Sequence, residues 1–226
     1  MQAGMIWTIP NILTVLRLLA APFLALTFVL LPPPYADVVG LGLFVGASLT
    51  DYVDGYLARK MNQQSKFGTM LDPIADKAMV VIALMVIGAL YGLNLWVLVP
   101  GAIILLREVF VSGLREFLGA DAGKLAVTKL AKWKTTVQMV AIAVLLARGL
   151  FEHYFGMNSF GMDATMVAEI LKGNLADEAG LVWNYRAMIA SFYGGIALLW
   201  LAAILTFVTG WDYFAKSLPY LREEPK

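Results

Sequence analysis

Four aspartates lie close together in an otherwise apolar chain. Asp51 and Asp54 are three residues apart, and Asp72 and Asp76 are four residues apart. An ionised carboxylate beside long apolar segments is costly unless a cation, a hydrogen bond or a proton compensates it. The sequence therefore indicates that these acids have a partner, and that chemistry is concentrated here.

The spacing of the acids places them on two helix faces. A helix over residues 51–59 brings two acids, two small residues and one cation within an arc of roughly 140°; these are Asp51, Asp54, Gly55, Ala58 and Arg59. On the next segment, a glycine and two acids recur every four residues and share one side; these are Gly68, Asp72 and Asp76. Two such helices direct four carboxylates at a common volume, which predicts a site for hard divalent cations. The arginine suits a phosphate group.

Two other interpretations of the acids stay open. Intramembrane acids can line an ion path, as in a divalent-cation transporter, although the inverted repeats typical of transporters are not evident in this sequence. Alternatively, Asp72 can cap a helix whose first turn contains Pro73. The first alternative predicts cation flux across sealed vesicles, and the second predicts a purely structural role.

Membrane-spanning helices are expected to position these residues. The chain has 226 residues, of which 60% are hydrophobic and 15% charged, and its mean hydropathy is +0.75. This profile predicts an all-α polytopic membrane protein, a bundle of six transmembrane helices in a single domain over residues 1–226. The predicted spans are residues 9–31, 38–59, 69–91, 95–118, 133–150 and 188–208. A longer external loop is expected at about 151–187, with an amphipathic helical piece at 164–171.

Basic residues indicate the orientation of the bundle. They gather in the loops after the second and fourth spans, at Arg59, Lys60, Lys66, Lys124, Lys129 and Lys132. By the positive-inside rule, the N and C termini are then cytoplasmic and the acids lie toward the cytosol. The net charge of +1 suggests no nucleic-acid partner, and the absence of cysteine excludes cysteine-based metal sites.

A polar stripe opens the first predicted span. Asn11, Thr14 and Arg17 are spaced by three residues and share one face of an otherwise apolar helix. One interpretation is ordinary: Arg17 extends to the membrane surface and Thr8 or Asn11 caps the helix. The functional interpretation is that the stripe faces the acidic pocket and helps hold a nucleotide or phosphate.

A second polar group closes the fourth predicted span and continues into the next segment. Arg107, Arg115 and Lys134 lie in or beside apolar segments, where cations require anionic partners. A phosphorylated acceptor alcohol is one such partner, and internal pairing with Glu108 and Glu116 is the alternative. Carboxylates for metal together with cations for phosphate are the requirements of a two-metal phosphoryl-type transfer.

The acidic segment also resembles a known family. Its pattern, D-x2-D-G-x2-A-R-x8-G-x3-D-x3-D, is similar to that of the CDP-alcohol phosphotransferases and shows no departure from it. Members displace CMP from a CDP-linked lipid or alcohol by an acceptor hydroxyl, use Mg²⁺ or Mn²⁺, and are generally homodimers. The resemblance implies metal ligation by Asp51, Asp54, Asp72 and Asp76, with Asp76 also acting as general base. It implies CDP binding by Asn11, Thr14, Asp54, Gly55, Ala58, Arg59 and Gly68.

The choice of acceptor also rests on resemblance. The segments around Arg107 to Glu116 and Lys132 to Gln138 are similar to those of family members that form phosphatidylglycerophosphate. This implies transfer of a phosphatidyl group from CDP-diacylglycerol to sn-glycerol 3-phosphate in the bacterial cytoplasmic (inner) membrane. Arg107, Arg115 and Lys134 would then bind the acceptor phosphate. Serine, inositol phosphate or phosphatidylglycerol are the alternative acceptors.

Overall fold

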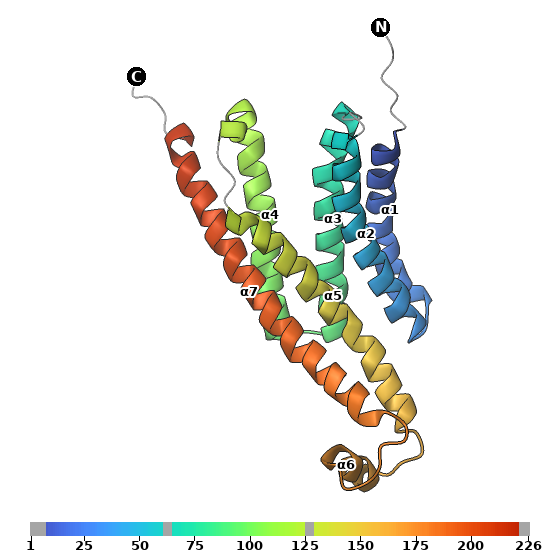
Figure 1. Ribbon diagram of the computed structural model, residues 1–226. Coiled ribbons are helices and arrows are strands. Elements are labelled where there is room, and N and C mark those ends of the chain that lie inside the picture. The colour runs from blue at the N-terminus through green and yellow to red at the C-terminus, as the bar shows by residue number, and fades with distance from the viewer. Residues whose placement is uncertain (1–7, 61–64, 125–128, 222–226) are drawn as a thin grey trace. The chain divides into compact units, whose positions relative to one another are not determined.

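The protein is built from helices. The computed structural model describes residues 8–60, 65–124 and 129–221, with all their side chains except those of 52–59, 120–121, 124, 129 and 131–132. No strand occurs in these three ranges. Their helices, shown in Figure 1, are α1 (Ile9–Leu30), α2 (Tyr35–Lys60), α3 (Lys66–Tyr91), α4 (Leu95–Leu118), the 3₁₀ helix η1 (Gly119–Lys124), α5 (Lys129–Asn158), α6 (Ala164–Lys172) and α7 (Leu181–Leu221).

The prediction of an all-α polytopic membrane protein is confirmed. Within the described residues, five helices are long and apolar enough to cross a membrane: α1, α3, α4, α5 from Trp133 onward, and α7. The remaining long helix, α2, has 26 residues and covers the predicted second span. Many large apolar side chains of these helices are exposed, as expected of surfaces that face lipid tails.

Side-chain caps set the starts of the helices that carry the site. The Thr8 side chain accepts a hydrogen bond from the backbone N–H of Asn11 at the start of α1, and Pro10 lies in the first turn, where no N–H is required. At the start of α3 the Ser65 hydroxyl accepts from the backbone N–H of Gly68 at 3.0 Å. Because α3 begins at Lys66, Asp72 lies inside the helix, and its interpretation as a helix cap is wrong.

The last two spans are longer, and the loop between them shorter, than the sequence predicts. The sequence predicts that the fifth span ends at residue 150, but α5 continues to Asn158. It predicts the sixth span at 188–208, but α7 runs over 41 residues. Only residues 159–180 therefore connect these helices. They contain α6, which matches the predicted amphipathic piece and is capped by Asp163, whose side chain accepts from the backbone N–H of Met166.

The chain forms two compact units. The first contains residues 1–87 and 142–195, and the second contains residues 88–141 and 196–226. In the first unit α1 packs against α2. In the second unit a small apolar core joins α4 to α7 through Val111, Leu114, Leu118 and Tyr213. Each unit holds one of the two polar groups that the sequence predicts.

Candidate functional site

In the first unit, the polar stripe of α1 faces the acids of α2 and α3. Asn11, Thr14 and Arg17 are only 2–3% exposed. Each contacts a polar side chain from another part of the chain, as described below. Arg17 is buried, so the interpretation in which it extends to the membrane surface is wrong. The stripe is instead the surface on which the candidate site is built.

Arg17 joins the two acidic segments. Its Nη1 atom donates to Oδ1 of Asp51 and to Oδ1 of Asp76, each at 2.6 Å. The arginine side chain is 2% exposed, whereas those of Asp51 and Asp76 are 49% and 43% exposed. The cation thus lies behind the two carboxylates, and the carboxylates remain open to ligands. These ion pairs join distant parts of the chain, because Asp51 is 34 positions and Asp76 is 59 positions after Arg17.

Thr14 holds the third described acid. Its hydroxyl lies 2.7 Å from Oδ1 of Asp72 and 3.1 Å from the backbone carbonyl of Pro10. A hydroxyl has one hydrogen to donate, and the shorter distance and the negative charge both favour the carboxylate. The first helix therefore orients Asp72 as well as Asp51 and Asp76.

Asn11 belongs to a smaller network at the start of α3. The Ser65 hydroxyl donates to Oδ1 of Asn11 at 2.9 Å and accepts from the backbone N–H of Gly68. A Cβ atom at Gly68 would lie 2.6 Å from Oδ1 of Asn11, so a larger residue at this position would displace the Asn11 side chain. Sequence reasoning did not assign Ser65 a role; its signal is a hydroxyl three residues before the motif glycine, the spacing of a cap.

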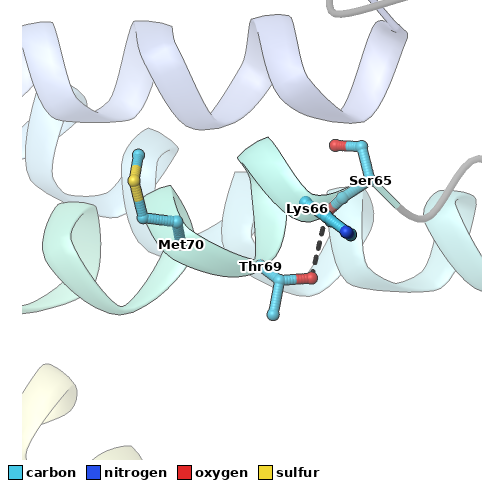
Figure 2. A pocket seen from close by; sticks show the side chains of 4 residues that line it. All are labelled: Ser65, Lys66, Thr69 and Met70. Carbon is cyan, nitrogen blue, oxygen red and sulfur yellow. Dashed lines mark hydrogen bonds between the residues drawn. The ribbon is translucent and has the colours of Figure 1, made fainter. Parts of the chain in front are cut away.

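A surface pocket of about 490 Å³ opens beside this network. Ser65, Lys66, Thr69 and Met70 line it. Figure 2 shows these side chains at the start of α3, where the Thr69 hydroxyl donates to the backbone carbonyl of Ser65 at 2.9 Å. The pocket combines hydroxyl groups, one ammonium group and a methionine, which suits a ligand with both polar and apolar parts.

The described acids carry ligand atoms of the type that binds hard cations. Carboxylate oxygens are the preferred ligands of Mg²⁺ and Mn²⁺, and oxygens of Asp51 and Asp76 converge on one nitrogen of Arg17. No group of three metal-binding side chains forms within the described part of the chain. The predicted site residues Asp54, Gly55, Ala58 and Arg59 lie on α2 where no side chain is described, so their predicted roles fall outside the described residues.

The second unit contains the predicted phosphate-binding cations. Glu108 of α4 accepts a hydrogen bond from Nη1 of Arg107 at 3.1 Å and another from Nζ of Lys134 of α5. Internal pairing, left open by the sequence, therefore occurs for these two cations. One carboxylate cannot neutralise two cations, and Arg115 adds a third positive charge, with its guanidinium 5.5 Å from the centre of the Tyr213 ring. The group retains a net positive charge suited to an anion.

The chain is similar in sequence to several known proteins. A model of the CDP-alcohol phosphatidyltransferase family matches residues 7–209. A protein of Cereibacter sphaeroides is 56% identical over 218 residues, 96% of this chain and 99% of the relative. A Rickettsia bellii protein is 37% identical over 94% of this chain and 96% of its own length. A Salmonella typhimurium protein is 40% identical over 71% of this chain and 88% of its own. All three are named CDP-diacylglycerol–glycerol-3-phosphate 3-phosphatidyltransferase.

Proposed function

Because this chain belongs to the CDP-alcohol phosphatidyltransferase family, we propose that it transfers the phosphatidyl group of CDP-diacylglycerol to sn-glycerol 3-phosphate. The products are phosphatidylglycerophosphate and CMP. The observation that carries this proposal is the 56% identity, over 96% of the chain, to a relative named for that reaction. The contacts between α1 and the acids support it, because they bring Asp51, Asp72 and Asp76 of the family's motif against one face of α1.

The reaction is a displacement at phosphorus. A hydroxyl oxygen of glycerol 3-phosphate bonds to the phosphorus that carries diacylglycerol, and the bond from this phosphorus to the bridging oxygen of CMP breaks. The proton of the hydroxyl passes to a carboxylate oxygen of Asp76. Arg17 keeps that carboxylate in place, since its Nη1 atom donates a hydrogen bond to Oδ1 of Asp76.

Metal dependence is part of this proposal. Asp51, Asp54, Asp72 and Asp76 would hold a pair of Mg²⁺ or Mn²⁺ ions. When bound, these ions supply positive charge to the attacking and leaving oxygens. Thr14 orients Asp72 through its hydroxyl. CDP-diacylglycerol would be bound by Asn11, Thr14, Asp54, Gly55, Ala58, Arg59 and Gly68.

The acceptor phosphate is assigned to the cations of the second unit. Arg107, Arg115 and Lys134 offer donors to phosphate oxygens, while Glu108 holds Arg107 and Lys134 in position. A neutral acceptor such as serine would leave these positive charges without a ligand. This favours glycerol 3-phosphate over serine, and acceptor kinetics must decide between it and the other phosphorylated acceptors.

The proposed setting is a bacterial cytoplasmic membrane. Six spans, cytoplasmic termini and a site open to the cytosol would let a soluble acceptor meet a lipid donor, and a homodimer is the proposed assembly. The chain lacks cysteine, so single-cysteine variants can test the orientation in intact cells. A membrane-impermeant maleimide should label Asn174→Cys between α6 and α7, but label Lys216→Cys near the end of α7 only after lysis. The reverse pattern would overturn the orientation.

The reaction is tested with purified protein, CDP-diacylglycerol and Mg²⁺. Glycerol 3-phosphate, serine, inositol phosphate and phosphatidylglycerol are offered in turn, and CMP is measured. We expect CMP only with glycerol 3-phosphate, and none after chelation of the metal. CMP formation with another acceptor would change the assigned substrate. Divalent-cation flux into sealed vesicles without CMP formation would indicate that the protein is a transporter and not an enzyme.

A further inference from the structure

The last helix contacts the proposed acceptor site in the second unit. Gly210 and Tyr213 are three residues apart on α7, and both are buried. Their neighbours are two of the three cations of α4 and α5 to which the acceptor phosphate is assigned. The sequence predicts no functional residue on this helix, because nothing in its apolar pattern distinguishes these two positions from ordinary packing.

Gly210 lies directly against Arg107. A Cβ atom at this position would lie 2.9 Å from Cγ of Arg107, 3.6 Å from its Nε and 3.8 Å from its Cδ. Real Cβ atoms essentially never approach a carbon within 3.0 Å, so an added methyl group must displace something. The contacted atom is near the base of the arginine side chain and not at its flexible end. The side chain of Arg107 is 18% exposed and its head contacts Glu108, which restricts where it can move.

Tyr213 lies against Arg115. The guanidinium carbon is 5.5 Å from the centre of the tyrosine ring, within the range of a cation–π contact. The ring belongs to the apolar core that joins α7 to Val111, Leu114 and Leu118 of α4. Phe110 and Phe214 add a further ring contact between the same helices, with centroids 5.6 Å apart. The tyrosine ring is therefore fixed, and it limits the positions open to the guanidinium.

We infer that Gly210 and Tyr213 of α7 are positioning residues of the acceptor site: the glycine leaves the space in which Arg107 lies, and the tyrosine ring supports Arg115. The inference rests on the proposed function, since it concerns the cations assigned to the acceptor phosphate. It predicts that changes on α7 alter the KM for glycerol 3-phosphate selectively. The KM for CDP-diacylglycerol should stay the same.

Gly210→Ala is the first test, with Gly194→Ala as its matched control. Both changes add one methyl group to α7, but nothing lies within 4 Å of the position of the added atom at Gly194. We expect Gly210→Ala to raise the acceptor KM roughly ten- to a hundredfold, because a displacement of about 1 Å in a binding group can cost this much. Gly194→Ala should behave as the unchanged protein does. An unchanged acceptor KM in Gly210→Ala would overturn the role of Gly210.

A double-mutant cycle separates positioning from general damage to the helix. Arg107→Ala removes the Cγ atom that an added methyl group would meet. Gly210→Ala should therefore have almost no further effect on the acceptor KM in the Arg107→Ala protein. If the two effects on KM simply multiply, the methyl group acts elsewhere and the inference fails.

Two substitutions test the role of the Tyr213 ring. Tyr213→Leu should raise the acceptor KM about three- to tenfold, and Tyr213→Phe should restore most of that loss, because a phenyl ring retains the cation–π contact. A larger loss in Tyr213→Phe than in Tyr213→Leu would show that the hydroxyl and not the ring matters. These outcomes are distinct from failure of the proposed function, in which the unchanged protein would release no CMP with glycerol 3-phosphate.

Discussion

Replacing Thr14 by valine tests whether α1 controls the acids of the site. Valine has nearly the same shape as threonine but cannot donate a hydrogen bond. In the unchanged protein the Thr14 hydroxyl lies 2.7 Å from Oδ1 of Asp72, and the residue is 2% exposed. Water therefore has little room to replace the lost donor, and Asp72 becomes free to rotate away from its position.

The size of the effect follows from the charge of the hydrogen-bond acceptor, the Asp72 carboxylate. A hydrogen bond to a charged group contributes about 1.5–3 kcal/mol. Asp72 is partly exposed, and solvent can satisfy its other oxygen, so the lower end of this range applies. A loss of about 1.5 kcal/mol in the transition state corresponds to roughly a tenfold fall in kcat/KM for CDP-diacylglycerol.

The assay is CMP release over a series of Mg²⁺ concentrations. If Asp72 is a metal ligand, Thr14→Val should also need more Mg²⁺ for half-maximal activity. Thr14→Ser keeps the hydroxyl and should keep most of the activity, which controls for the change in shape. Unaltered kcat/KM and Mg²⁺ dependence in Thr14→Val would refute the reasoning that α1 orients this acid.

Three further predictions follow from the described contacts. Asp76→Asn should lower CMP formation at least about a hundredfold while binding of CDP-diacylglycerol, measured by calorimetry, persists; retained turnover would remove Asp76 from the role of base. Arg17→Met leaves two partly exposed carboxylates without their cation, so the metal-free protein should lose roughly 1–3 kcal/mol of its free energy of unfolding. In thermal unfolding, added Mg²⁺ should stabilise this variant more than it stabilises the unchanged protein. Equal unfolding curves would contradict this. Hydrogen bonds from the Thr165 hydroxyl and the Met166 backbone N–H lower the pKa of Asp163. The cap of α6 is therefore fully formed at pH values above the usual carboxyl pKa, and it is lost as the pH falls through the lowered pKa of Asp163. Amide exchange in α6, corrected for intrinsic rates, should rise at low pH in the unchanged protein but not in Asp163→Asn, which keeps an acceptor oxygen. The same pH response in both proteins would assign it to other groups.

Periodicity in the sequence predicts which residues share a helix face, but not the partners they meet. The spacing of Asn11, Thr14 and Arg17 indicates a polar stripe, and the structure confirms that the stripe faces the acids. The individual pairs depend on how far each helix is shifted along its neighbour. That shift is set by packing of the apolar side chains, and no local pattern in the sequence reports it.

Hydropathy underestimates the length of helices that continue past an apolar span. Arg148 and Glu152 lower the hydropathy near the end of α5, yet they form an i,i+4 ion pair at 3.1 Å on a helix that continues to Asn158. Asp212 and Lys216 form the same kind of pair near the end of α7. Charged residues that end a predicted span therefore belong to the helix here, which is why the predicted loop at 151–187 is too long.

Gly210 shows a second limit of sequence reasoning. A glycine in an apolar helix usually indicates close helix packing. In α7 the neighbour of Gly210 is a charged side chain, and only coordinates reveal it. The reason is physical: a glycine in the sequence indicates that space is left for a neighbour, but the packing of another helix decides which chemical group fills that space.

The described ion pairs of the two polar groups differ in the sign of their charge balance. In the first unit, one guanidinium pairs with two carboxylates, so the side chains of Arg17, Asp51 and Asp76 together carry a negative charge. In the second unit, Glu108 faces two cations, and a positive charge remains. In an apolar protein such uncompensated charges are costly, and the cost falls when a ligand of opposite sign binds. Divalent cations should therefore stabilise the protein through the first group, and phosphate-bearing acceptors through the second. Unfolding temperatures measured with Mg²⁺ alone, glycerol 3-phosphate alone and both together would separate the two contributions.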